Sequence, residues 1–335
     1  MRAIQLSAFG LEHLDLVDLP TPRPGPHEVL VRMEAASLNF RDHMVINGDL
    51  YRGVPLPIVP VSDGAGTVLE IGEGVTRFKP GDRVTTFYKS RWIAGAMRSE
   101  WEGAEIGGPE PGVMRELACF DQYSLARAPA HFSAVQAATL PIAALTAWQV
   151  LEQARVTTGQ TVLLLGTGGV SLFALQFAQL RGARAIVLSS SDDKLERAKA
   201  LGADIGINYR THPQWGPLVR EASGAGVDLV VETIGAATLA QSLKAVCMHG
   251  FVAILGWLGG NEAKLPLTPV VLKRVRLQGI SVAPLEAHER MVAAIEATGL
   301  EPVIDHVYGF TELREALERL VAGRHFGKLA IDFNR

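Results

Sequence analysis

The feature that most constrains the fold is a buried apolar run that leads directly into a glycine turn and an apolar helical pattern. It occupies residues 161–171, which read TVLLLGTGGVS. A glycine turn at this place lets the backbone approach a pyrophosphate, and the start of the following helix offers free N–H groups and a positive dipole. Ser171 stands where the usual fingerprint has a third glycine, and a purely structural turn is the alternative. We predict dinucleotide binding through four residues of the turn: Gly166, Gly168, Gly169 and Val170.

Apolar runs and helical patterns alternate from Thr161 onwards, which is typical of a parallel sheet covered by helices. The runs lie at 161–165, 184–188, 227–231 and 250–255, and the helical patterns lie at 169–181, 192–201 and 236–247. The first part of the chain instead consists of short strands separated by Gly and Pro turn signals, which predicts a compact, mostly β domain. A chain of 335 residues is long enough for both domains.

The remaining regions are a regular tail and one irregular segment. After about residue 270 the pattern predicts a strand at 275–282, a helix at 284–298, a strand at 303–308, a helix at 311–322 and a last strand at 328–332. We expect this tail to return to the first domain. Residues 90–112 lack periodicity, and so long an irregular segment is commonly a functional or a mobile loop.

The charge and composition exclude several classes of function. A net charge of −3 gives no field for nucleic acid or for an anionic membrane. The first residues lack the apolar core of a signal peptide, and no run reaches the ~18 apolar residues of a membrane span. The two cysteines, Cys119 and Cys247, form neither a CxxC pair nor a disulfide framework. We therefore expect a soluble cytoplasmic protein that acts on a small molecule and binds neither nucleic acid nor a membrane.

The end of the second apolar run indicates which dinucleotide binds. Residues 185–194 read AIVLSSSDDK, at the place where a fold that binds NAD has one acidic residue. Such a carboxylate accepts hydrogen bonds from the ribose diol and repels a 2′-phosphate. Ser189 and Ser190 remove the repulsion and add donors, and Lys194 supplies a cation, so these residues favour NADP(H) over NAD(H). The alternative is that the serines and Asp192 only cap the next helix.

Short motifs follow one another in a specific order along essentially the whole chain. They are SLNFRD at 37–42, DGAG at 63–66, GEGV at 72–75, KPGDRV at 79–84, AATLP at 137–141, LTAW at 145–148, the glycine turn, ALGAD at 200–204, INYR at 207–210 and HFGK at 325–328. Each motif is short, but their order and spacing resemble the medium-chain dehydrogenase/reductase superfamily, and most closely its zinc-free quinone oxidoreductase-like branch.

The resemblance implies an α/β protein in which both chain ends build a GroES-like, mostly β catalytic domain. A Rossmann domain with a doubly wound parallel sheet lies between them in sequence. We expect the catalytic domain at 1–124 and 270–335 and the NADP(H)-binding domain at 125–269. In NADPH-using members, a lysine after the second strand and a tyrosine after the third hold the 2′-phosphate, and Lys194 and Tyr209 match those positions. The resemblance also implies a homodimer.

Zinc is not expected, because this chain departs from the family's zinc-binding branches at the ligand positions. Zinc alcohol dehydrogenases place a cysteine where this chain has Asn39 and a histidine where it has Ser62. Residues 140–143, which contain the third ligand position, offer no ligand side chain, and residues 90–112 lack the four cysteines of a structural zinc site. Zinc needs a full set of N, S or O ligands at suitable spacing. We therefore expect no metal.

The candidate catalytic residues follow from the same resemblance and from residue chemistry. Asn39 is a candidate for a contact to the cofactor ribose or the substrate oxygen, although Asn also commonly holds a turn. Asp42 lies beside it and either takes part or forms an ordinary ion pair with Arg41. Thr146 matches a family threonine near the nicotinamide, and Lys328 matches a cofactor-proximal lysine. A threonine bonded to its own helix and a solvated lysine at a strand end are the alternatives.

The predicted reaction is hydride delivery to an activated acceptor. Without a Lewis acid the oxidation of simple alcohols is harder, whereas a quinone or a conjugated enone needs only orientation and hydrogen bonding. We predict an NADPH-dependent, zinc-independent reductase of quinones or α,β-unsaturated carbonyls. Two alternatives remain, since a fold does not fix function: a metal-free alcohol/aldehyde dehydrogenase-like enzyme, and an NADPH-binding protein with little catalysis.

Overall fold

The computed structural model describes residues 1–51 and 53–335 and divides the chain into two compact units. Unit 1 comprises Met1–Leu145 and Ala283–Arg335, and unit 2 comprises Thr146–Val282. Both boundaries lie later in the chain than the predicted 124/125 and 269/270. Strand β7 (Leu125–Arg127) pairs with β5 (Arg83–Thr86) in unit 1, and β13 (Arg276–Gly279) pairs with β12 (Val246–Ile254) in unit 2. Strand pairing between distant segments, which a local pattern does not report, thus sets the boundaries.

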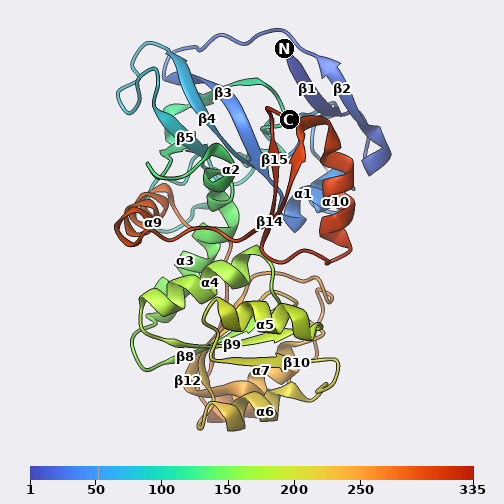
Figure 1. The fold of residues 1–335 in the computed structure, drawn as a ribbon, viewed down its shortest axis with the longest axis vertical. Helices are drawn as coiled ribbons and strands as arrows, with labels where there is room; N and C mark the ends of the chain where they lie inside the picture. The colour runs from blue at the N-terminus through green and yellow to red at the C-terminus, as the bar shows by residue number, and fades with distance from the viewer. Residues whose placement is uncertain (52) are drawn as a thin grey trace. The chain divides into compact units, whose positions relative to one another are not determined.

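Unit 1 is mostly β, as predicted, and is built around a seven-stranded sheet of order β14-β15-β3-β4-β5-β7, with β6 also paired to β3. Its other strands are β3 (Glu28–Ser37), β4 (Asp63–Ile71), β6 (Leu117–Asp121), β14 (Ile304–Gly309) and β15 (Lys328–Asp332), and β1 (Arg2–Leu6) pairs with β2 (Leu14–Asp18) in a second sheet. The helices are α1 (Phe40–Ile46), α2 (Ala134–Ala137), a π-helical turn (Leu140–Ala144), α9 (Leu285–Thr298) and α10 (Leu313–Val321), with short 3-10 turns at Leu11–His13, Ser99–Trp101, Gln122–Ser124 and Phe310–Glu312 (Figure 1).

The last part of the chain returns to unit 1, as expected. β15 runs antiparallel to β3, with Ala330 opposite Ser37, and β14 pairs in parallel with β15. α10 lies beside these two C-terminal strands (Figure 1). Because Lys328 begins β15, it lies next to Leu38 and Asn39, which follow the end of β3. The sheet therefore brings the two ends of the sequence to one place.

Unit 2 is a doubly wound parallel sheet of six strands in the order β10-β9-β8-β11-β12-β13. Its other strands are β8 (Thr161–Leu165), β9 (Arg184–Ser189), β10 (Ile205–Asn208) and β11 (Val227–Glu232), and its helices are α3 (Leu145–Ala154), α4 (Gly169–Leu180), α5 (Asp192–Ala200), α6 (Trp215–Ala222), α7 (Leu239–Ala245) and α8 (Leu267–Leu272). α4 and α5 cover one face, and α6 and α7 cover the other (Figure 1). Every residue of β8 is buried, because a parallel sheet with helices on both faces has no solvent side.

The sequence pattern misses four elements of unit 2, namely α3, β10, α6 and α8, and misplaces the end of another. β10 has only four residues and is largely half-buried at the sheet edge, so its apolar run is too short to stand out. α6 contains Gly216 and Pro217, which are breakers in general, but proline is tolerated in the first turn of a helix. The helix predicted at 236–247 ends at Ala245, because Val246 begins β12 and pairs with Val227 of β11.

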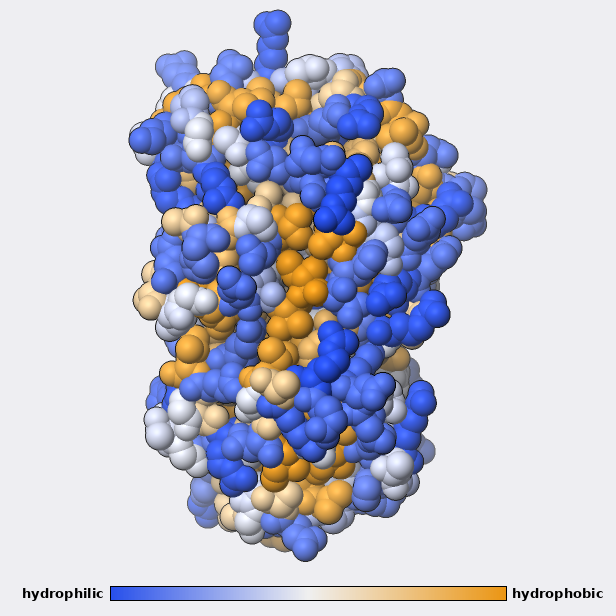
Figure 2. Space-filling model, in the orientation of Figure 1, coloured by the Kyte–Doolittle hydropathy of each residue, from blue (hydrophilic) through white to orange (hydrophobic). Residues whose placement is uncertain are grey.

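Hydrophilic side chains cover most of the face that Figure 2 shows, with apolar side chains between them. One helical stretch, Ala134–Ala154, has the length and the mean hydropathy, 1.3, of a membrane span. However, 67% of its apolar window is buried inside the protein. An apolar stretch that is mostly buried is typical of a core helix, so this stretch gives only weak support to a membrane location.

Candidate active site

The carboxyl edge of the unit 2 sheet brings three predicted regions together. β8, β9 and β10 are neighbours in the sheet, so the residues that follow them lie side by side. The backbone N–H of Gly166 donates to Leu188 O at 2.9 Å, and the N–H of Tyr209 donates to Ser189 O at 3.0 Å. Open α/β sheets bind their ligands at this edge.

The glycine turn fits a pyrophosphate. Gly166 has a φ of +84°, which favours glycine, and a Cβ at this residue would meet no atom within 4 Å, so the space beside the turn is open. Gly168 precedes α4, whose first N–H groups have no partner within the helix. Ser171 is buried and its Oγ donates to Leu165 O at 3.0 Å, which explains how serine replaces the third glycine. A dinucleotide would be held here by Gly166, Gly168, Gly169 and Val170.

The structure gives different places to the three serines at the end of β9. Ser191 is the residue that caps α5, because its Oγ accepts from the Lys194 N–H at 3.4 Å. Ser189 is 2% exposed, and its Oγ accepts from the Ser191 N–H at 3.3 Å. Ser190 is half-buried. Neither Ser189 nor Ser190 is the helix cap, so the capping alternative applies to Ser191, and the part of Ser189 and Ser190 in phosphate binding stays a prediction.

Asp192 and Tyr209 lie in the same neighbourhood of the sheet edge. The Asp192 carboxylate accepts from Asn208 Nδ2 at 2.8 Å, which ties the start of α5 to the end of β10. This bond uses one oxygen of an acidic group whose charge would repel a 2′-phosphate bound near it. Tyr209 is 42% exposed, so its side chain is accessible to a ligand.

Glu232, at the carboxyl end of β11, organises the next loop along this edge. It was not among the residues that the sequence predicted for the site. It is fully buried, and its carboxylate accepts from the N–H groups of Ile234 and Gly235, both at 3.0 Å. It also accepts from Thr238 Oγ1 at 2.7 Å and Ser242 Oγ at 2.5 Å. An acidic residue that directly ends a buried apolar strand is the signal that would have found it.

In unit 1, Asn39 lies at the centre of a polar cluster that precedes α1. Its backbone N–H donates to Asp42 Oδ2 at 2.8 Å. Its side-chain Nδ2 donates to Asp63 Oδ2 at 2.8 Å, and its Oδ1 accepts from Lys328 Nζ at 2.7 Å. Lys328 Nζ also donates to Leu38 O at 2.6 Å. Two of the predicted residues, Asp42 and Lys328, are therefore both bonded to a third, Asn39, although Lys328 is far from the others in sequence.

Asp63 and Ser62 complete this cluster. Ser62 Oγ lies 3.2 Å from Asp42 Oδ1 and 3.3 Å from Asp63 Oδ1, and the Ile142 N–H donates to Asp63 Oδ2 at 3.1 Å. Asp42, Ser62 and Asp63 are all buried. From the sequence, Ser62 was notable only because it stands where zinc alcohol dehydrogenases have a histidine ligand, and Asp63 was given no role. A charged residue at the start of a β-strand in the DGAG motif was the available signal.

Burial changes the pKa values of the whole cluster. It raises the pKa of the Asp63 carboxyl to about 7; Lys328 opposes this rise and Asp42 adds to it. Burial also raises the pKa of Asp42, against the effect of Arg41. The pKa of the Lys328 ammonium is lowered by burial, while Asp63 and Asp42 act in the opposite direction. The charges of this cluster therefore depend on one another.

Arg41 anchors the irregular segment 90–112 to α1. Its guanidinium pairs with Asp42 at 3.6 Å and donates to Gly107 O at 3.4 Å and Gly108 O at 2.5 Å. It also lies over the Tyr88 ring, 4.6 Å from the centroid, and donates to Tyr88 Oη at 3.1 Å. Within the segment, Glu105 is 1% exposed and accepts from Lys89 Nζ at 2.6 Å. Arg41 thus does more than form an ion pair: it holds the segment in place.

The remaining predicted residues belong to unit 2. Thr146 is the second residue of α3 and is 6% exposed. It lies in the same unit as the glycine turn, Ser189, Ser190, Lys194 and Tyr209, whereas Asn39, Asp42 and Lys328 lie in unit 1. A contact between Thr146 and a nicotinamide stays a prediction.

The residues of the cluster do not fit a zinc ion. In the part of the chain that the structure describes, no group of three or more His, Cys, Asp or Glu side chains could hold a metal. The cluster contains two carboxylates, an amide and a hydroxyl, and the ammonium of Lys328 already bonds to the amide. Zinc in proteins prefers thiolate and imidazole ligands, and a second cation beside an ammonium is unfavourable.

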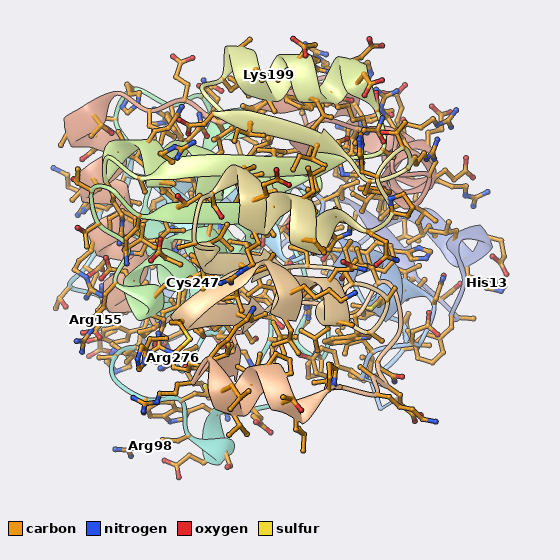
Figure 3. The ribbon with its side chains drawn as sticks, turned by 90° about the horizontal axis from the view of Figure 1, so that it is seen from below. His13, Arg98, Arg155, Lys199, Cys247 and Arg276 are labelled. Carbon is orange, nitrogen blue, oxygen red and sulfur yellow. The ribbon has the colours of Figure 1, made fainter. Side chains whose placement is uncertain are left out.

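A separate pocket of about 450 Å³ lies at the opposite, amino-terminal edge of the unit 2 sheet. Its lining includes Arg155, Cys247 and Arg276 (Figure 3). The Arg276 guanidinium stacks over the Phe251 ring at 4.0 Å, and burial raises the pKa of the Cys247 thiol, which makes the thiolate scarce. Because Arg276 begins β13, this pocket is not at the edge where the glycine turn lies.

Comparison with known proteins identifies the family. Two family models match the chain: an alcohol dehydrogenase GroES-like domain over residues 25–130 and a zinc-binding dehydrogenase over residues 169–317. A zinc-type alcohol dehydrogenase-like protein of Schizosaccharomyces pombe is 38% identical over 331 residues, which cover 96% of each chain. The chain belongs to the medium-chain dehydrogenase/reductase superfamily. The rat quinone oxidoreductase-like protein 2 is 30% identical over 77% of this chain and 69% of its own, and the acryloyl-coenzyme A reductase of Metallosphaera sedula is 26% identical over 94% and 95%.

Solved structures of this superfamily share the fold. A putative alcohol dehydrogenase from Sinorhizobium meliloti has a TM-score of 0.93 and 41% identity, and the match covers 99% of this chain and 98% of that one. A mycobacterial protein complexed with NADPH has a TM-score of 0.83 and 27% identity over 99% of both chains. These matches confirm the predicted GroES-like and Rossmann architecture. This medium-chain dehydrogenase/reductase is therefore an oxidoreductase.

Proposed function

We propose that this oxidoreductase transfers hydride from NADPH to a quinone or an α,β-unsaturated carbonyl and needs no metal. The observation that carries the proposal is the composition of the cluster around Asn39. It offers an amide N–H and an ammonium in place of thiolate and imidazole ligands. Such a cluster can orient and hydrogen-bond an electrophile, but it supplies no Lewis acid for the oxidation of a simple alcohol.

The preference for NADPH is supported by the edge of β9. Ser189 and Ser190 stand where a carboxylate would repel a 2′-phosphate, and Lys194 and Tyr209 follow β9 and β10 at the same edge. One oxygen of Asp192, an acidic group at the start of α5, is bonded to Asn208. The NADPH complex of the mycobacterial relative, at 27% identity, agrees with this assignment.

When bound, the reduced nicotinamide supplies the hydride. We propose that Asn39 donates an amide N–H to the substrate oxygen or to the cofactor ribose, and that Thr146 packs near the nicotinamide. A carbonyl oxygen that accepts a hydrogen bond makes its conjugated carbon a better hydride acceptor. The first 150 residues contain no Tyr-x-x-x-Lys pair for a proton relay, so we expect the balancing proton to come from solvent. The relatives described as quinone oxidoreductase-like and as an acryloyl-coenzyme A reductase agree with such substrates.

A second candidate is a metal-free alcohol or aldehyde dehydrogenase. It is favoured by the names of the Schizosaccharomyces and Sinorhizobium relatives, which describe alcohol dehydrogenases or proteins like them. An NADPH-binding protein with little catalysis is the third. The three differ in turnover, so one screen separates them.

The test is an anaerobic screen of NADPH oxidation with a panel of quinones and enones, together with NADP⁺ reduction by primary alcohols. We expect quinones or enones to be reduced and primary alcohols to be poor substrates, and elemental analysis to find no stoichiometric zinc. Efficient alcohol oxidation with no quinone or enone turnover would favour the second candidate. Tight NADPH binding without any turnover would favour the third, and about one zinc per chain retained after dialysis against a chelator would contradict the metal-free proposal.

A further inference from the structure

Two buried carboxylates in unit 1 lie near one lysine, whose ammonium bonds to the Asn39 amide that also donates to Asp63. Asp42 and Asp63 are 1% and 0% exposed, and Ser62 Oγ lies within 3.3 Å of an oxygen of each. Buried carboxylates this close disfavour each other's charge unless a cation is present. Lys328 is 3% exposed, and both carboxylates act to hold its proton. Arg41 pairs with Asp42 from the other side, at 3.6 Å. The cluster therefore contains its own cation.

The same lysine determines which way the Asn39 amide faces. An ammonium only donates hydrogen bonds, so Lys328 must bond to the amide oxygen Oδ1, which leaves Nδ2 to donate to Asp63. A flipped amide would place its NH₂ against the ammonium and its oxygen against the carboxylate. With one Nδ2 hydrogen used by Asp63, the second has no protein acceptor among the residues that the structure describes. Asn39 is half-buried, so the residue is not closed off from solvent.

We propose that Lys328 is a positioning residue. Its ammonium balances the charge of the buried Asp42–Asp63 pair, and it acts on the reaction by holding the Asn39 amide in the orientation that leaves one N–H free. Lys328 thus acts through Asn39 and not through its own contact with the cofactor. The proposal rests on the proposed function in one respect, because it assumes that the Asn39 N–H meets the substrate or the cofactor. It does not depend on the preference for NADPH over NADH.

The first experiment measures turnover of Lys328→Ala. Loss of a hydrogen bond to a charged group corresponds to roughly 10- to 100-fold in an equilibrium or a rate. We expect kcat/KM for a quinone substrate of the wild type to fall by that factor, mainly through kcat, while the Kd for NADPH changes less than about threefold. Propylammonium matches the deleted end of the side chain, so it should restore at least about tenfold of the lost rate. 1-Propanol, which has the same size and no charge, should not.

The second experiment needs no substrate. Propylammonium should raise the Tm of Lys328→Ala relative to sodium chloride at equal ionic strength, and it should leave the Tm of the wild type unchanged. Lys273→Ala is the matched control, because Lys273 Nζ donates to three backbone carbonyls and to no carboxylate. We expect this variant to keep kcat/KM within about threefold of wild type, without rescue by the amine.

Two further variants guard against a folding defect. Lys328→Arg keeps the cation and should retain more activity than Lys328→Met, which keeps the length of the side chain and loses its charge. Full kcat in Lys328→Met, or no response to propylammonium in rate and in Tm, would overturn the proposal. Weaker NADPH binding with an unchanged kcat would overturn it too, because it would show that Lys328 binds the cofactor directly. If the wild type reduces no quinone and no enone, the proposed function fails, and the Tm experiment alone decides the role of the lysine.

Discussion

The two candidate regions of the molecule are built in opposite ways. The glycine turn of unit 2 is a short continuous segment that exposes backbone N–H groups at the end of a strand. The Asn39 cluster of unit 1 is a buried network of side chains from α1, β4 and β15, which lie far apart in sequence. A turn of the first kind depends on backbone conformation, whereas a network of the second kind depends on charge balance. Substitutions should therefore affect the two regions through different measurable quantities.

The largest expected effect is on cofactor affinity, from Gly166→Val. Gly166 and Gly159 have nearly the same φ, +84° and +87°, and a Cβ at either meets no atom within 4 Å. Both Val substitutions should therefore lower the free energy of unfolding by a similar amount, on the order of 1–2 kcal/mol. Only Gly166 lies in the glycine turn, so Gly166→Val should raise the Kd for NADPH by about 100-fold or more, and Gly159→Val by less than about threefold. Fluorescence titration measures both, and equal losses of affinity would show that the turn is only structural.

A smaller effect is expected from the residues that distinguish the two dinucleotides. Lys194→Ala should weaken NADPH binding by roughly tenfold and leave NADH binding nearly unchanged, because a hydrogen bond to a charged group is worth about 1.5–3 kcal/mol. Ser190→Asp should shift the preference further, since it restores a carboxylate near the phosphate. Lys199→Ala is the control from the same helix, where Lys199 pairs with Glu196 at 2.8 Å. Equal losses for NADPH and NADH in Lys194→Ala would mean that the lysine supports the fold.

The effect that is smallest in the wild type is on the pH dependence of stability, where two buried groups of unit 1 act in opposite directions. The pKa of Asp63 is about 7 in the folded protein, above the ordinary 3.8 of its carboxyl, so the folded state keeps a proton that the unfolded chain loses. Its contribution makes the protein less stable as pH rises from about 4 to about 7. Burial lowers the pKa of His288 from 6.5 to about 4, so between these pH values the unfolded chain binds a proton that the folded state does not bind. Its contribution makes the protein less stable as pH falls from 6.5 to about 4.

The contributions of Asp63 and His288 give the free energy of unfolding opposite slopes against pH. The two slopes largely offset each other between pH 4.5 and 6.5, and variants that remove one group should reveal the slope of the other. Each slope approaches about 1.4 kcal/mol per pH unit. In Asp63→Asn the free energy of unfolding should rise more steeply with pH than in wild type, and in His288→Asn it should fall with pH. Urea unfolding at three pH values in this window measures the slopes. Parallel curves for all three proteins would contradict the assigned pKa directions.

The contrast between the regions also explains what the sequence could and could not predict. The glycine turn, the strand before it and the serines at the end of β9 are local patterns, and the structure has them where the sequence predicted them. Asn39, Asp42 and Lys328 were singled out separately, but their contact depends on the pairing of β15 with β3, which no local pattern reports. Lys328 was expected to be a cofactor contact or a solvated lysine, and its burial against Leu38 O and Asn39 rules out the solvated lysine, while a cofactor contact stays a prediction. Glu232 and Asp63 were missed because their roles arise from the groups that surround them.

The most direct test of the central claim follows the hydride itself. The protein is dialysed against a chelator, its metal content is measured, and the same sample reduces an enone anaerobically with NADPH that carries deuterium at C4 of the nicotinamide. We predict that deuterium from one face of C4 appears at the carbon β to the carbonyl, at a rate per chain that removal of zinc does not change. A product without deuterium from either face, or a rate that falls with the zinc content, would contradict the account.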